Sequence, residues 1–468
     1  MNRSLASLAL LLALGCAAAA RAGEPTETLV VPTFGKVFLY APGGEPQQVV
    51  LFVSGDGRWN HGVIPMAERL RDLGALVVGI DIRTFLHSME ASPACAYPAG
   101  ALEELSRAVQ LHRHLAAYER PILVGYSSGA TLVYAALAAA PAETFAGAIS
   151  LGFCPDLEIH RAPCKSRGLT SVARAKAAAY DLAPFAGLEV PWMVLQGEDD
   201  QVCAAATTRA FVAATGSSRL VSLPGVGHGF SKPRNWEPQL VEAYRAIAAA
   251  ERAQLPDRSH AAGVEDLDLV EVAAGGPARD VMAVILTGDG GWADLDKSVG
   301  AGLAAAGVPV VGWSSLRYYW APRTPEGAAR DLARIIDHYS AAWRKGHVLL
   351  VGYSFGADVL PFLVNRLPET SRARIAGVTL LGLSDTAAFE LRLTSWLGGG
   401  GEARYRTLPE IGRATVPVTC VRGSDEGDSA CKAAKGPRVR IVAVPGGHHF
   451  DGDYSKLVEL ILGSGRTA

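Results

Sequence analysis

The same alternation of hydrophobic and polar positions runs through both halves of this chain. Short apolar runs rich in β-branched residues alternate with longer segments rich in alanine and leucine. The first kind is typical of buried strands, and the second of helices that pack against them. Residues 121–124 and 347–351 are two such strands, and each leads into a helical segment. This alternation predicts an α/β fold of mostly parallel sheets flanked by helices.

Residues 1–22 show a different pattern, with Arg3 followed by an apolar run over residues 5–14 and a small-x-small cleavage site at residues 20–22. The run is too short to span a bilayer. We therefore expect a cleaved signal peptide and export to the periplasm. A lipoprotein anchored through Cys16 is the weaker alternative, because residues 13–15 form an imperfect lipobox.

Four landmarks occur twice, in the same order. They are Gly-Asp-Gly-x-Trp (55–59 and 288–292), Gly-x-Ser-x-Gly (125–129 and 352–356), an acidic loop after a strand (197–203 and 423–431) and a glycine-rich loop with histidine and phenylalanine (223–230 and 444–450). This order predicts a tandem duplication after the signal peptide, with domains at 23–251 and 264–468 joined by a linker at 252–263.

Gly-x-Ser-x-Gly between a strand and a helix resembles the nucleophile elbow of α/β-hydrolases, and Ser-acid-His is the order of that superfamily. In the second half, Ser354 is the candidate nucleophile and His448 its candidate base. His449 stays open as the base, because alignment on the proline instead of the phenylalanine selects it. These roles predict acyl transfer to water through an acyl-enzyme.

Three residues compete for the acid of this second triad. Asp428 is preferred because it precedes Cys431 by the same interval that separates Asp200 from Cys203. Asp425 and Glu426 are rivals, since an acid often follows the strand-end glycine by about three residues.

An oxyanion hole requires two backbone N–H groups. We expect one from Phe355 and the other from the turn that contains Asp289 and Gly290.

The first half offers candidates for the same catalytic and oxyanion roles. Its residues are Ser127, Asp200 and His228, with Ser128 and Gly57 as oxyanion donors. The sequence leaves open whether this first copy is active or an idle fold.

Asp358 lies one helical turn after Ser354 and is a candidate to receive a cationic substrate group or to bond a loop. Aromatic residues 318–320 and Trp396 are candidates for an acyl pocket or for core packing. Histidine spacings indicate no metal site, and no dinucleotide fingerprint is present, so we expect no metal and no cofactor.

Charge and cysteine content narrow the function further. The chain has 44 basic and 46 acidic residues without a basic block, which excludes an evident nucleic-acid groove. Without Cys16, six cysteines remain, an even number that suits an oxidising compartment. Closeness in sequence favours the pairs Cys154–Cys164 and Cys420–Cys431, with Cys95–Cys203 left over, and free thiols remain an alternative.

The second half also resembles the family of bacterial virulence proteins called VirJ, and the whole chain resembles its two-domain relative AcvB. The segments that carry this resemblance are residues 288–292, 317–325, 351–361, 365–368, 389–390 and 445–453. The resemblance implies a periplasmic serine hydrolase that removes the aminoacyl group from aminoacylated phosphatidylglycerol at the membrane surface. A lysyl or alanyl group is the expected acyl part, and Asp358 or Glu390 would face its ammonium. Another exported carboxylesterase or thioesterase is one alternative, and an inert hydrolase fold used for binding or secretion is a second.

Overall fold

The computed structural model describes residues 23–60, 62–91, 95–141, 144–166, 168–175, 177–254, 263–391, 405–452 and 454–464. The predicted signal peptide with Cys16, most of the predicted linker and Trp396 lie outside these residues. Within them, none of the helices combines the length and the apolar character needed to cross a bilayer.

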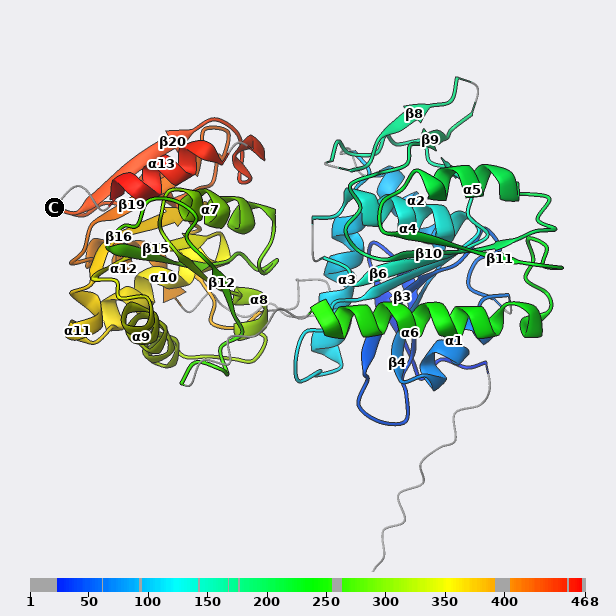
Figure 1. The fold of residues 1–468 in the computed structure, drawn as a ribbon, viewed down its shortest axis with the longest axis horizontal. Coiled ribbons are helices and arrows are strands. Elements are labelled where there is room, and N and C mark those ends of the chain that lie inside the picture. The colour runs from blue at the N-terminus through cyan, green and yellow to red at the C-terminus, as the bar shows by residue number, and fades with distance from the viewer. Residues whose placement is uncertain are drawn as a thin grey trace, which may run out of the picture.

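Two separate sheets, one in each half of the chain, form the centres of two lobes (Figure 1). The first has the order β1-β2-β4-β3-β5-β6-β10-β11 and the second the order β12-β14-β13-β15-β16-β19-β20. Within these two sheets, all pairs of neighbouring strands are parallel except β1–β2, β2–β4 and β12–β14. The second sheet therefore repeats the strand order of the first without its first strand, which is what a tandem duplication predicts.

The strands of the first sheet are β1 (Glu27–Val31), β2 (Gly35–Tyr40), β3 (Gln48–Val53), β4 (Ala75–Ile80), β5 (Ile122–Tyr126), β6 (Gly147–Leu151), β10 (Trp192–Gly197) and β11 (Ser218–Leu223). Those of the second are β12 (Leu269–Val272), β13 (Val281–Leu286), β14 (Val310–Trp313), β15 (His347–Tyr353), β16 (Ile375–Leu381), β19 (Val418–Gly423) and β20 (Val439–Val444). Every residue of the central strands β3 and β10 is buried, because helices cover both faces.

Helices pack on both faces of each sheet and so create two hydrophobic cores per lobe. In the first lobe, one face is covered by α2 (Ile82–Ala91), α3 (Pro98–His112), α4 (Ser128–Ala139) and α5 (Ala205–Ala213), and the other by α1 (Ile64–Asp72) and α6 (Glu237–Gln254). In the second lobe, one face carries α8 (Ser315–Tyr318), α9 (Pro325–Ala342), α10 (Phe355–Arg366) and α12 (Thr407–Gly412), and the other α7 (Asp294–Ala305) and α13 (Ser455–Ser464). Short α11 (Glu369–Arg372) follows α10.

Small strands lie beside the candidate sites. In the first lobe β7 (Asp156–Leu157), β9 (Tyr180–Leu182) and β8 (Ser171–Ala173) form a three-stranded sheet after β6. In the second lobe β17 (Thr386–Ala387) pairs with β18 (Tyr405–Arg406) after β16. Each insertion follows the strand next to the nucleophile strand, so each can form part of a substrate site.

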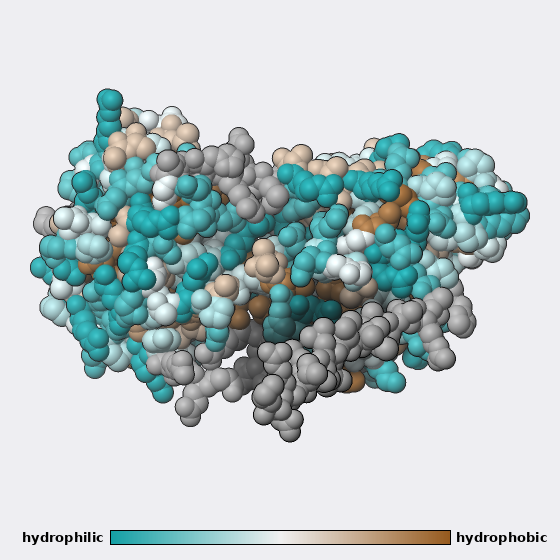
Figure 2. All heavy atoms as spheres, turned by 90° about the horizontal axis from the view of Figure 1, so that it is seen from below, coloured by the Kyte–Doolittle hydropathy of each residue, from teal (hydrophilic) through white to brown (hydrophobic). Residues whose placement is uncertain are grey.

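The two lobes contact each other through α3 and α8, which face one another in Figure 1. The indole N–H of Trp320 donates to the carbonyl oxygen of Leu115 at 2.7 Å. The Tyr118 and Trp320 rings pack with centroids 5.3 Å apart, and both are buried together with Leu316. Trp320 thus packs against the other domain and does not line an acyl pocket. Figure 2 shows a mainly hydrophilic surface over both lobes on the face seen from below.

The disulfides differ in part from the expected pairing. Cys420–Cys431 is present as expected, but the other two bridges are Cys95–Cys164 and Cys154–Cys203. The guess from sequence proximity was wrong because the segment after β6 folds back over the sheet. It brings Cys154 to the loop after β10 and Cys164 to the segment before α3.

Non-reducing peptide mapping of the folded protein is expected to recover these three bridges. Replacing both Cys154 and Cys203 by serine should lower the free energy of unfolding of the first lobe by about 2–4 kcal/mol, because the bridge restricts the unfolded chain. A Cys154–Cys164 peptide in the map would contradict the structure.

Candidate active sites

Both candidate nucleophiles sit on a strained turn between a strand and a helix. Ser127, between β5 and α4, has φ 55° and ψ −123°, and Ser354, between β15 and α10, has φ 49° and ψ −116°. A non-glycine residue with positive φ costs roughly 1–3 kcal/mol and is maintained only where the surroundings enforce it. The turn presents each hydroxyl at the carboxyl end of its strand, beside the first turn of a helix.

The glycines of the elbow are required because backbones approach too closely for a side chain. A Cβ on Gly129 would lie 2.3 Å from the carbonyl oxygen of Val53, and one on Gly356 would lie 2.2 Å from that of Leu286. Each helix therefore packs directly against the neighbouring strand, β3 or β13. This close packing holds the serine in its strained conformation.

In the second lobe, His448 connects the nucleophile to an acid. Its Nε2 lies 2.9 Å from Ser354 Oγ, and its Nδ1 lies 2.5 Å from Glu426 Oε1. The expected pairing of Ser354 with His448 is therefore present. His449 turns away from the serine, and its Nδ1 lies 2.9 Å from the Tyr353 hydroxyl. Burial, together with the nearby His448, lowers the pKa of His449 and favours its neutral form.

The preferred acid, Asp428, is wrong: the carboxylate that reaches His448 is its rival Glu426. Asp428 is exposed, whereas Glu426 is buried and its Oε2 accepts the N–H of Gly423 at 3.2 Å. Cysteine register misled the prediction because the two cysteines are not equivalent. Cys203 pairs with Cys154 from another element, while Cys431 pairs with Cys420 of the adjoining strand.

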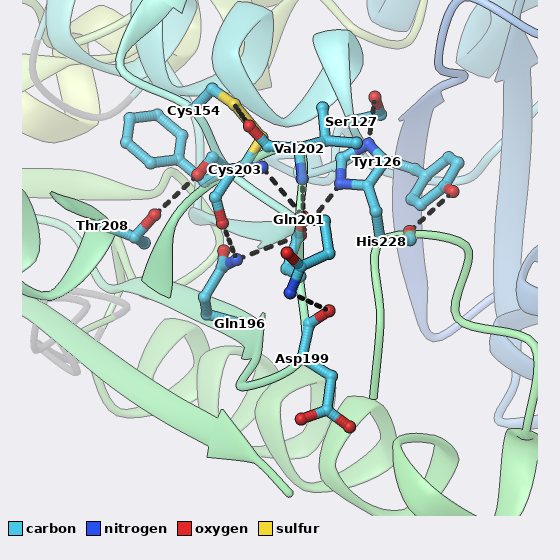
Figure 3. Close-up of polar contacts among 12 residues, drawn as sticks. Tyr126, Ser127, Cys154, Gln196, Asp199, Gln201, Val202, Cys203, Thr208 and His228 are labelled. Carbon is cyan, nitrogen blue, oxygen red and sulfur yellow. Dashed lines mark hydrogen bonds and ion pairs between the residues drawn. A yellow bond between two sulfur atoms is a disulfide. The ribbon is translucent and has the colours of Figure 1, made fainter. Parts of the chain in front are cut away.

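In the first lobe, all three expected residues come together. Ser127 Oγ lies 2.9 Å from His228 Nε2 (Figure 3). His228 Nδ1 lies 2.9 Å from Asp200 Oδ2. Asp200 also accepts the N–H groups of Val202 and Cys203, each at 2.8 Å. The first copy thus has a complete hydrogen-bonded triad and is not an eroded remnant.

Neighbouring side chains hold this triad in place. The Gln196 side-chain amide donates to Asp200 Oδ2 at 3.1 Å and to the Cys203 carbonyl at 2.9 Å. Figure 3 shows the Tyr126 hydroxyl directed to the backbone of His228, to whose carbonyl it donates at 2.8 Å. Tyr126 and Tyr353 therefore both fix a histidine loop, although Tyr353 does so through the side chain of His449.

The Gly-Asp-Gly turns pass directly beside the serines, as an oxyanion role requires. A Cβ on Gly55 would lie 3.0 Å from Ser127 Cβ, and one on Gly288 would lie 3.6 Å from Ser354 Cβ. Ser128 and Phe355 begin α4 and α10, where N–H groups lack partners within the helix. The donor roles of Ser128, Gly57, Phe355, Asp289 and Gly290 stay predictions.

A buried hydroxyl fixes each of these turns. Ser54 Oγ donates to the Gly55 carbonyl at 3.1 Å and accepts the N–H of Ile82 at 3.2 Å. Thr287 repeats this in the second lobe, with Gly288 and Ser315 as its partners. Ser54, which lies outside the elbow, is therefore a structural hydroxyl.

Asp358 bonds a loop beside the second site. Its Oδ1 accepts the N–H of Ser384 at 2.7 Å. Burial, partly offset by the hydrogen bonds from Ser384, raises the pKa of Asp358 to about 7. Glu390 is half-buried and lies two residues before residues 392–404, which are outside the described residues. Its role toward a substrate ammonium stays a prediction.

A cavity of about 410 Å³ opens beside Ser127. Its wall includes the Cys154–Cys203 bridge, the apolar side chains of Ile82, Leu86, Leu157 and Val202, and the acidic side chains of Asp56, Asp156 and Glu158. Arg174 also lines it and pairs with Asp156 at 3.0 Å. The cavity beside Ser127 thus combines an apolar wall with acidic side chains, one of which is paired with an arginine.

The triad region also contains a group that resembles a metal site. Asp200, Cys203 and His228 have potential ligand atoms within 4.8 Å of one another. However, the Cys203 sulfur forms a disulfide with Cys154, and the other two residues bond each other. This set of donors does not fit a metal ion.

Two glycines were missed by the sequence reasoning. Gly152 and Gly382 follow β6 and β16, with φ of 66° and 67°. A Cβ on Gly382 would lie 2.7 Å from His448 Cε1, and one on Gly152 would lie 3.3 Å from His228 Nδ1. They make room for the histidine rings. The repeated Leu-Gly at 151–152 and 381–382 is the signal that could have found them.

Glu426→Gln is expected to lower kcat at Ser354 by a factor on the order of 10³–10⁴, because an amide cannot stabilise the imidazolium. Hydrolysis of a chromogenic ester by the full chain measures this in a Ser127→Ala background. Asp428→Asn is the matched control and should leave kcat unchanged. A large loss in the control with none in Glu426→Gln would restore Asp428 as the acid.

Asp358→Asn should stabilise the protein increasingly as the pH rises. Between about pH 4 and 7 the folded protein keeps a proton on Asp358 that the unfolded chain has released, so stability is lost as the pH rises. Asparagine removes this dependence and can still accept the Ser384 N–H. Thermal melts at pH 4.5 and 8 measure it, and an equal difference in Tm at both would contradict the raised pKa.

Solved structures similar to this chain have low identity to it. Est1E from Butyrivibrio proteoclasticus (13% identity, TM-score 0.33) covers 48% of this chain and 99% of its own. An esterase from Thermogutta terrifontis (18%, 0.36) covers 48% and 92%, and an alpha-beta serine hydrolase homologue from Coxiella burnetii (18%, 0.31) covers 48% and 97%. A comparison with curated proteins gives no match.

The family described as bacterial virulence protein (VirJ) matches residues 47–152 and 280–468. The second region contains Ser354, Glu426 and His448, whereas the first ends before Asp200. Together the matched regions make up more than half of the chain. This protein, two α/β-hydrolase folds in tandem, belongs to the VirJ family.

Proposed function

We propose that this protein is a periplasmic serine hydrolase that cleaves the aminoacyl ester of aminoacylated phosphatidylglycerol, such as the lysyl or alanyl form. The observation that carries the proposal is the hydrogen-bonded chain of Ser354, His448 and Glu426. Membership of the VirJ family supports the assignment to this copy, because the match spans the whole triad.

The reaction follows from this geometry. His448 Nε2 takes the proton of Ser354 as its oxygen attacks the ester carbonyl, and Glu426 stabilises the imidazolium. The tetrahedral oxyanion faces the N–H groups of Phe355 and the Gly-Asp-Gly turn. The intermediate then collapses, the bond between the carbonyl carbon and the glycerol oxygen breaks, and His448 gives its proton to that departing oxygen of phosphatidylglycerol. Water, deprotonated by the same histidine, attacks the aminoacyl-serine and releases the free amino acid.

Carboxylates near both serines support an aminoacyl substrate. Asp358 lies one turn from Ser354, and near neutral pH a substrate ammonium would favour its ionised form. In the first lobe, Asp56, Asp156 and Glu158 line the cavity beside Ser127. Neutral esters would gain nothing from these charges, so the carboxylates favour substrates that carry a cation.

A location in the periplasm agrees with the cysteines. Three disulfides, one of which borders the cavity beside Ser127, are expected in an oxidising compartment and are rare in the cytosol. Together with the signal-peptide pattern of residues 1–22, they favour export.

A second candidate function places an esterase activity at Ser127. The described cavity and the complete triad of the first lobe favour it. The acyl group of the substrate would enter between the acidic side chains of the cavity and the part of its wall formed by the Cys154–Cys203 bridge. The two serines could thus act on the same lipid class or on two different exported esters.

Purified protein incubated with vesicles of lysyl- or alanyl-phosphatidylglycerol should release free amino acid, scored by mass spectrometry. Ser354→Ala is expected to abolish this release, while Ser127→Ala, the matched variant of the other copy, should leave most of it. The reverse result would move the activity to the first lobe. Full release in the double variant Ser127→Ala/Ser354→Ala would contradict serine catalysis.

A further inference from the structure

The aspartate of the Gly-Asp-Gly turn is held differently in the two copies. In the first lobe, Asp56 is held within its own domain. The Ser128 hydroxyl donates to its carboxylate, and Arg83 Nη1 lies 3.6 Å from its Oδ1. Both partners come from the first turn of a helix beside the site, α4 or α2.

The second lobe lacks both of these partners. Ser128 follows the nucleophile, and the residue in that position is Phe355. Arg83 comes directly after Ile82, whose N–H donates to the buried hydroxyl of the first turn. In the second lobe Ser315 makes this contact, and the residue after it is Leu316. Neither Phe355 nor Leu316 can bond a carboxylate.

The other domain supplies the missing cation. Arg107 of α3, in the first lobe, places its Nη1 3.1 Å from Asp289 Oδ2. Arg107 Nη2 in turn donates to Glu103 Oε1 at 2.5 Å. The arginine side chain is 22% exposed and that of Asp289 58%. Glu103 thus fixes the guanidinium on its own helix while it reaches the turn of the other lobe.

Contacts between the two lobes hold α3 close enough to Asp289 for the ion pair with Arg107. Leu316, which replaces the arginine, packs with Tyr118 and Trp320 in the buried cluster between the lobes. Trp320 also donates to the Leu115 carbonyl just after α3. Leucine at position 316 therefore has two effects. It leaves Asp289 without a cation from its own domain, and it forms part of the interface that brings Arg107 to Asp289.

We propose that Arg107 is a positioning residue for the second active site, so that the first domain sets the oxyanion turn beside Ser354. The proposal rests on the proposed function, since it requires a reactive Ser354. Arg107 does not touch substrate. It acts through Asp289, whose backbone N–H and that of Gly290 must point toward the developing oxyanion.

The test uses the full chain with Ser127→Ala and a chromogenic butyrate ester. Arg107→Gln and Asp289→Asn should each lower kcat about tenfold, the effect of losing a charge-assisted hydrogen bond, with KM nearly unchanged. Because these effects share one contact, the double variant should fall no further than either single one. Arg107→Lys should recover part of kcat.

Arg219→Gln is the control, because it breaks an exposed ion pair with Glu242 in the same domain, far from either turn in the sequence. It should leave kcat unchanged. If Arg107→Gln lowers Tm, Asp289→Asn still decides the question, because the Asp289 side chain is mostly exposed.

Normal kcat in Arg107→Gln or Asp289→Asn, with an active parent chain, would overturn this inference and leave the proposed function standing. A rise in KM without a fall in kcat would also overturn it, since it would indicate substrate binding. No turnover at Ser354 in the parent chain would overturn the proposed function and this inference with it.

Discussion

The left-handed backbone of two serines is the constraint on which both sites depend. Each serine lies where a strand turns into a helix so sharply that helix and neighbouring strand touch through their backbones. Glycine on either side of the serine is the only residue that this contact admits. The many buried contacts of α4 and α10 in the hydrophobic cores offset the free-energy cost of this strained backbone. Catalytic geometry is therefore a by-product of core packing, and a substitution that loosens the helix would lower activity and stability together.

Around this shared turn, the two copies use different means to orient the histidine. Asp200 is short and is held by two backbone N–H groups and a glutamine. Glu426 is one methylene longer and accepts the N–H of Gly423, the last residue of its strand. Both arrangements supply hydrogen-bond donors to the carboxylate and so fix it beside the imidazole. The two copies thus share the hydrogen-bonded order Ser–His–acid and differ in the residues that support it.

Much of this could be predicted from the sequence because it depends on local rules. The strand-turn-helix elbows, the order of the landmarks and the strand-helix alternation predicted the tandem fold and brought Ser127, Asp200 and His228 together. Ser354 and His448 followed from the same patterns.

What the sequence could not provide depends on contacts between distant segments. The disulfide pairing required knowledge of how the insertion after β6 folds back. Glu426 could be chosen over Asp428 only with knowledge of which side chain is buried, and the spacing to a cysteine gives no information on burial. The spacing from the strand-end glycine to the acid, three residues in both copies, was the more reliable signal. Arg107 and Asp289 are far apart in the chain, so only the docking of the two domains shows that they meet.

The most direct test of this account is active-site titration of the folded wild-type protein with a fluorophosphonate, followed by peptide mass mapping. Two preassembled triads predict two adducts per chain, one on Ser127 and one on Ser354. Labelling of neither serine in the folded protein would contradict the account.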